Sequence, residues 1–184
     1  MRPTRFAAFL AVLGLGVAAY TPIASASSPR YGPAGDKFTV AFPSAPKSAA
    51  NTSQLLSGLP TGVRAYAYWV SASANIISGS SKVPKPPTYL IALLVFPSLS
   101  ATQSYLKGAT ASASGLSPVT LDGLKGYEYV GPENGKVNPP ADVTDRKATE
   151  ALVALQRKDA VYLISVITST RKETETFLGS FRAV

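Results

Sequence analysis

Hydrophobic and polar residues alternate in two short segments, 38–42 and 63–70. Alternation with a period of two is typical of a strand that buries one face. In the second segment it places Arg64, Tyr66 and Tyr68 on one face and smaller apolar residues, with one tryptophan, on the other. We therefore predict a strand in each segment, and a weaker strand over 48–56 between them.

The segment 88–96 is apolar at both alternating sets of positions, which predicts a central strand covered on both faces. Asp122-Gly123 lies between two strand-like runs and predicts a two-residue hairpin, because both turn residues must accept a positive φ. Residues 148–157 and 160–168 predict a second hairpin that turns at Lys158-Asp159.

Two helices are indicated by their start signals. Ser100 and Gln103 have the spacing of a capping box, and Gly115 offers the left-handed residue that ends the helix after them. Thr170 and Glu173 have the same spacing before an apolar stripe near the C-terminus. The elements together predict an α+β fold with a mainly antiparallel sheet of about six to eight strands.

The first 26 residues have the three parts of a secretory signal peptide: two arginines, an apolar run and an A-x-A site. We expect cleavage between Ala26 and Ser27, and therefore a secreted, extracytoplasmic protein. The alternative is a membrane anchor, but the apolar run over 6–20 is shorter than the roughly 20 residues of a spanning helix. No cysteine is present for lipid attachment, and no later segment has spanning length.

The remaining chain predicts one domain. Residues 27–36 contain turn formers without periodicity and predict a flexible lead-in. Residues 37–184 then form a single α+β domain, interrupted by Pro-rich loops over 71–87 and 131–147.

The chain has no histidine and no cysteine, which excludes Ser-His-Asp and Cys-His catalytic sets and thiolate metal sites. We expect no metal or other cofactor. The formal net charge of +8 falls to +6 when the signal peptide is removed. Between 27 and 121 there are seven basic residues and one acid, and a basic surface attracts anionic envelope components. General solubility explains the charge more simply, because no five-residue window is rich in Lys or Arg. We expect no nucleic-acid partner.

Four segments resemble the PsbP-like superfamily of extracytoplasmic and lumenal proteins. They are the opening Phe38–Pro46, the apolar strand 88–96 with its following helix, Leu124–Tyr129, and the final strand pair with a helix ending at Phe181. The resemblance implies an α/β/α sandwich, in which helices flank the sheet. Members of this superfamily are mostly non-enzymatic binding or assembly factors, so the resemblance assigns no site residues.

Candidate catalytic groups have simpler explanations. Ser-x-x-Lys occurs at Ser44, Ser104 and Ser169, as in penicillin-binding enzymes, but the other motifs of those enzymes are missing. Glu128 is the carboxylate least easily assigned to a turn or a cap, and a cross-strand ion pair would explain it. We therefore expect no enzymatic activity.

Arg64, Tyr66 and Tyr68 form the candidate binding face, since a cation and two aromatic rings in line suit stacking on sugars or on a partner surface. The alternative is that another element covers this face and makes the tyrosines part of the core. Asn51-Thr52-Ser53 also matches a glycosylation sequon.

Three functions are compatible with these features. The first is a secreted, non-catalytic binding or envelope-associated domain with an extracellular protein or an anionic envelope component as its partner. The second is a small extracellular enzyme that depends on a carboxylate or a lysine. The third is electrostatic attachment to anionic wall polymers or lipid headgroups through the basic part over 27–121.

Overall fold

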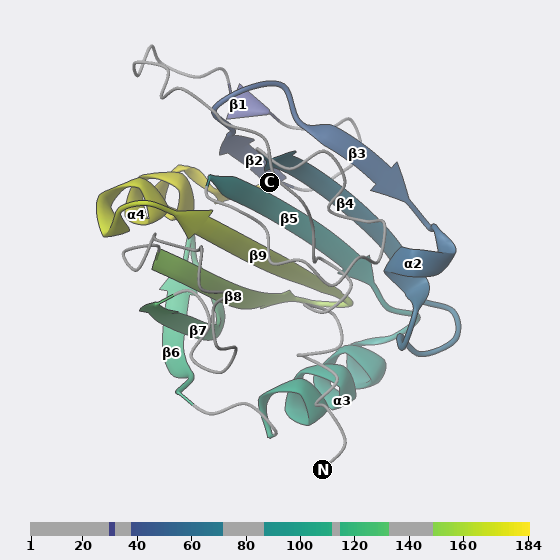
Figure 1. Ribbon diagram of the computed structural model, residues 1–184. Coiled ribbons are helices and arrows are strands. Elements are labelled where there is room, and N and C mark those ends of the chain that lie inside the picture. The colour runs from purple at the N-terminus through teal and green to yellow at the C-terminus, as the bar shows by residue number, and fades with distance from the viewer. Residues whose placement is uncertain (1–29, 32–37, 72–86, 112–114, 133–148) are drawn as a thin grey trace, which may run out of the picture.

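The computed structural model describes residues 30–31, 38–71, 87–111, 115–132 and 149–184. The predicted signal peptide and its cleavage site at Ala26 and Ser27 lie outside the described residues, as do most of the two Pro-rich loops. The described elements are two antiparallel sheets and three helices, so the fold is mostly β (Figure 1).

The larger sheet has seven strands in the order β3-β4-β5-β9-β8-β7-β6, and all neighbours are antiparallel. The strands are β3 (Lys47–Ala50), β4 (Arg64–Ser71), β5 (Thr88–Val95), β6 (Ser117–Leu121), β7 (Leu124–Pro132), β8 (Thr149–Arg157) and β9 (Ala160–Thr168). The mainly antiparallel sheet and its predicted strand number are confirmed. β5 is buried along nearly its whole length, as its apolar sequence predicts.

The smaller sheet has three strands in the order β1-β2-β10: β1 (Arg30–Tyr31), β2 (Phe38–Ala41) and β10 (Arg182–Ala183). Only β2 is predicted by the sequence pattern. Two-residue strands carry no periodicity, so β1 in the lead-in and β10 at the C-terminus were not predicted.

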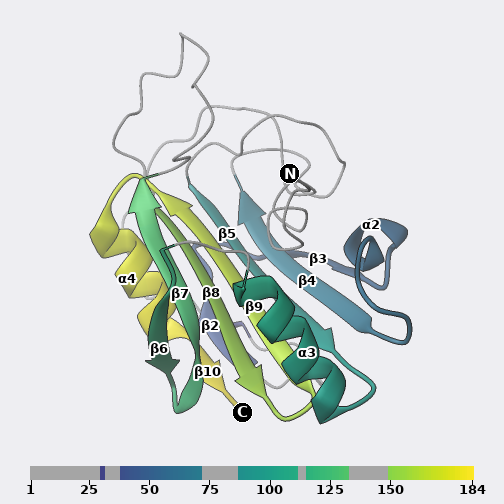
Figure 2. The same ribbon diagram turned by 90° about the horizontal axis from the view of Figure 1, so that it is seen from below.

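The helices are α2 (Ser53–Leu56), α3 (Leu99–Thr110) and α4 (Arg171–Ser180). α3 lies on one side of the large sheet, whereas α4, β2 and β10 lie on the other (Figure 2). We call these the α3 side and the α4 side. The cover on the α4 side is thus shared between a helix and a second sheet.

Both sides of the large sheet are packed. On the α3 side, Tyr105 and Leu106 of α3 pack on a core that includes Leu94 of β5 and Val161 of β9. On the α4 side the core is rich in aromatic rings. Phe38 of β2 stacks on Phe181 with ring centroids 6.1 Å apart, and Phe177 of α4 lies 4.8 Å from Tyr89.

The start of α4 agrees with its prediction, and that of α3 does not. Thr170 caps α4 by accepting a hydrogen bond from Glu173 N at 3.2 Å. The N-cap of α3 is Ser98, two residues before the predicted cap Ser100, because Ser98 has extended φ and ψ and its hydroxyl accepts a hydrogen bond from Ala101 N. α3 also ends at Thr110, so Gly115 adopts its positive φ of +78° beyond the helix rather than at its end.

The strand predicted over 48–56 is wrong in its second half. β3 ends at Ala50, Asn51 adopts a φ of +49°, and Thr52 caps the short helix α2. The Asn51 side chain also contacts β4, where its Oδ1 accepts a hydrogen bond from Ala65 N at 2.9 Å. The first two residues of the sequon therefore have local structural roles.

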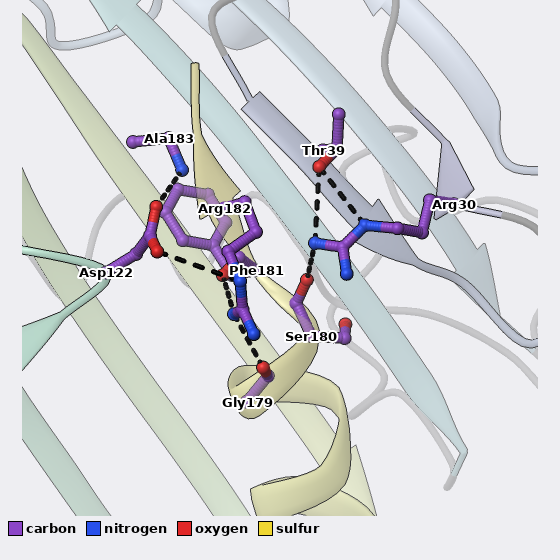
Figure 3. Close-up of polar contacts among 8 residues, drawn as sticks. All are labelled: Arg30, Thr39, Asp122, Gly179, Ser180, Phe181, Arg182 and Ala183. Carbon is purple, nitrogen blue, oxygen red and sulfur yellow. Dashed lines mark hydrogen bonds and ion pairs between the residues drawn. The ribbon is translucent and has the colours of Figure 1, made fainter.

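Two arginines connect the first and the last described strands to the rest of the fold (Figure 3). Arg30 in β1 donates to the Ser180 carbonyl at 2.6 Å and to Thr39 Oγ1 at 3.3 Å. Arg182 in β10 lies 3.7 Å from the Asp122 carboxylate, in the β6–β7 turn. These contacts hold the small sheet against the α4 side.

Candidate binding surface

The predicted binding face at Arg64, Tyr66 and Tyr68 is largely covered. Tyr68 is only 7% exposed, and its ring lies 5.6 Å from both the Tyr31 and the Phe38 rings. Tyr66 is half-buried and Arg64 is exposed. The covering element is the small sheet, so the three side chains do not form an open stacking strip.

A second run has the same pattern on the other side of the sheet. Lys125, Tyr127 and Tyr129 alternate along β7, and Tyr127 pairs with Ala154, whose side chain belongs to the core on the α3 side. By alternation, all three side chains face the α3 side. The cation and the two aromatic rings are therefore in line, as in β4, but on the opposite face.

This part of the α3 side is open to solvent. The register places seven accessible or half-buried residues together on β6, β7 and β8, and we call them the open face: Pro118, Thr120, Lys125, Tyr127, Tyr129, Leu152 and Gln156. On the same side of β5 and β9, Leu90, Leu94 and Val161 are buried. Figure 2 shows α3 toward β9 and β5, with β6 and β7 to its side.

Tyr127 is the most accessible ring of the open face, with 41% of its surface exposed. Tyr129 is half-buried beside Gly115, where a Cβ atom would lie 3.5 Å from the tyrosine ring. One ring is thus available for stacking, while the other is held by packing.

Gly126 allows this segment of β7 to lie unusually close to β8. A Cβ atom at Gly126 would lie 1.9 Å from the Ala154 carbonyl oxygen, so β7 approaches β8 more closely than any side chain permits. Close backbone approach is a recurrent reason for glycine inside a strand. Lys125 and Tyr127 on either side of it are held against β8 as a result.

A shallow depression adjoins the open face where two hairpins end side by side. It is lined by Gly123, Leu124, Lys125, Gln156 and Lys158. Gly123 and Lys158 are turn residues with positive φ. The lining contains two ammonium groups and no carboxylate.

The catalytic candidates do not converge in the described part of the chain. Ser44, Ser104 and Ser169 are all exposed, as are the lysines that follow them by three residues. Glu128 faces the α4 side, opposite Ser117 and Val153, so its cross-strand neighbours are not cations. No three acidic side chains of the described residues form a metal site.

Burial or ion pairing shifts the pKa of several described side chains. Burial raises the pKa of Tyr105 to about 12. Burial and the charge of Glu173 raise the pKa of Tyr89 to about 12. The hydrogen bond that Arg171 donates to Glu175 raises the pKa of Arg171, and the charge of Glu128 acts in the same direction. Both phenols therefore stay protonated at neutral pH.

Comparison with known proteins identifies no family. No family model and no curated protein matches the chain. A crystal structure at 1.50 Å from Bacteroides thetaiotaomicron VPI-5482 is similar, with a TM-score of 0.47 and 10% identity. The match covers 86% of this chain and 49% of that protein, so the chain spans about half its length. The PsbP-like resemblance remains a prediction.

Among the described residues, no helix has the length and apolar character needed to cross a membrane. The basic residues described in the first part of the chain lie on separate elements: Arg30 on β1, Lys47 on β3, Arg64 on β4 and Lys107 on α3.

Proposed function

We propose that the protein is a secreted, non-catalytic binding domain with a PsbP-like α/β/α arrangement, and that the open face contacts its ligand. The observation that carries the proposal is the exposure of Tyr127 in line with Lys125, on a part of the sheet where α3 leaves the strands accessible.

The chemistry of the open face supports binding. An exposed tyrosine offers a rigid ring and a hydroxyl group, and such residues contribute strongly to recognition at interfaces. Gln156 and Thr120 add hydrogen-bonding groups beside it. Strand β7 is fixed by Gly126 and pairs with β8, so the ligand would meet a surface that is already formed.

Export is supported by the placement of β1. Arg30 lies three residues after the predicted new N-terminus at Ser27, and it is bonded to Ser180 and Thr39. Cleavage after Ala26 would therefore leave every described element in the mature protein.

The enzymatic alternative is less well supported. A carboxylate- or lysine-dependent enzyme needs a desolvated acid or amine beside a second reacting group. Among the described residues, the Ser-x-x-Lys pairs are exposed, and Glu128 is half-buried near a charged arginine.

Cosedimentation tests the proposal. Purified mature protein over 27–184 is mixed with washed cell envelopes from the source cells. We expect Tyr127→Ala to lower the bound fraction at least tenfold. Val130→Ala is the matched control, because Val130 is 40% exposed on the opposite face of the same strand. Equal binding by the two variants would contradict the proposal.

A further inference from the structure

The depression beside the open face has the composition of an anion site. Lys125 and Lys158 line it with Gln156, and none of its lining residues is acidic. Two ammonium groups that share one concave surface raise the local positive potential. The Gln156 amide lines the same depression and can hydrogen-bond the same ligand group.

The carboxylates nearest in sequence do not line this depression. Asp122 precedes Gly123, but its carboxylate accepts from Ala183 N at 2.7 Å and faces Arg182. Asp159 follows Lys158 and is exposed in the turn. Arg171–Glu175 and Arg182–Asp122 are ion pairs, and neither of them includes Lys125 or Lys158.

The depression and the exposed ring are adjacent. Lys125 lines the depression, and Tyr127 follows it by two residues on the same face of β7. Two residues along a strand span about 7 Å. A ligand that extends along β7 can therefore place an anionic group at the lysines and a flat ring face on Tyr127.

From this arrangement we propose that the open face and the depression together bind an acidic polysaccharide, whose sugar rings carry carboxylate groups. This inference rests on the proposed function and names its ligand class. A sugar ring stacks on Tyr127, and the carboxylate of a neighbouring unit lies at Lys125 and Lys158. Gln156 and Thr120 hydrogen-bond the sugar hydroxyls.

A sugar polymer fits this surface better than a lipid membrane does. Beside Tyr127 the open face presents an amide, a hydroxyl and a proline, from Gln156, Thr120 and Pro118. Its one aliphatic side chain of length, Leu152, is half-buried, and so is the Tyr129 ring. Membrane-surface binding requires apolar residues that enter the acyl region beside the basic ones. The line of groups along one strand also suits an extended chain.

The test uses short polygalacturonate oligomers and their methyl esters, which carry the same rings without the charge. Titration calorimetry at low salt measures both against the mature protein. We expect binding of the acid form, and at least tenfold weaker binding of the ester. The double variant Lys125→Gln/Lys158→Gln should lose at least tenfold in affinity for the acid form. The control Lys47→Gln/Lys107→Gln has the same net charge and should lose less than twofold.

Three results would overturn the inference: equal binding of acid and ester, equal losses in the site and control variants, or binding to anionic lipid vesicles without binding to the oligomers. Envelope cosedimentation separates this failure from failure of the proposed function. If Tyr127→Ala abolishes envelope binding while the double lysine variant retains it, the binding surface stands and the acidic ligand is wrong. Circular dichroism of each variant verifies its fold.

Discussion

The Asp122 carboxylate accepts a hydrogen bond from the Ala183 main-chain N–H at 2.7 Å, across 61 positions of sequence. Asp122 also has a φ of +50°, so one residue both forms the β6–β7 turn and holds the C-terminal strand. Figure 3 shows this contact beside the Arg182 side chain. The edge hairpin and the small sheet are therefore coupled through a single carboxylate.

Asp122→Gly should separate the two roles of this residue. Glycine accepts the positive φ but removes the acceptor, so we expect a loss of about 1–2 kcal/mol in the free energy of unfolding, because a hydrogen bond to a charged group is lost. Amide exchange at Ala183 should become faster. Asp122→Asn retains an acceptor oxygen and the turn preference, and should lose less. Unchanged exchange at Ala183 in the glycine variant would contradict this role.

Gly126→Ala should destabilise the protein, whereas Gly108→Ala should not. At Gly126 the added methyl group meets the Ala154 carbonyl, and a backbone shift of this kind costs about 1–3 kcal/mol. At Gly108, inside α3, the methyl group meets no atom within 4 Å, and alanine should stabilise the helix by up to about 1 kcal/mol. Urea unfolding measures both variants, and shifts of the same sign would argue against the close approach of β7 and β8.

Stability should fall as the pH rises from 10 to 12. In the folded protein the pKa of Tyr105 is raised to about 12 from 10, because burial disfavours the phenolate. The folded state therefore holds its proton where the unfolded state releases it. The resulting stabilisation is complete below pH 10 and is lost as the pH rises through 12. Tyr105→Phe should flatten this dependence, and an identical alkaline slope in the variant would contradict the assignment.

Local signals predicted the turns well. Asp122-Gly123 forms the predicted hairpin with two positive φ values, because that requirement is set by the turn residues themselves. The start of α3 was predicted at Ser100, whereas the N-cap is Ser98. The spacing of a capping box does not determine the backbone conformation, and it is Ser98 that has the extended φ and ψ of a cap.

The accessible surface could not be predicted in this way. Arg64-Ala-Tyr66-Ala-Tyr68 and Lys125-Gly-Tyr127-Glu-Tyr129 have the same alternation of one cation and two aromatic rings. Tyr68 is covered by the rings of Tyr31 in β1 and Phe38 in β2, which belong to another segment of the chain and another sheet. Tyr127 is accessible because α3 packs toward β5 and β9. Packing between distant segments therefore determines which of the two tyrosine pairs is exposed. The alternation of residues along a strand does not predict it.

Nuclear magnetic resonance mapping tests the binding surface most directly. Isotope-labelled mature protein over 27–184 is titrated with solubilised envelope polymer, and the amide shifts are followed residue by residue. We expect the largest shifts at Lys125, Tyr127, Tyr129 and Gln156, and small shifts at Tyr66 and Val130. Shifts concentrated on the α4 side, or none at saturating polymer, would contradict this expectation.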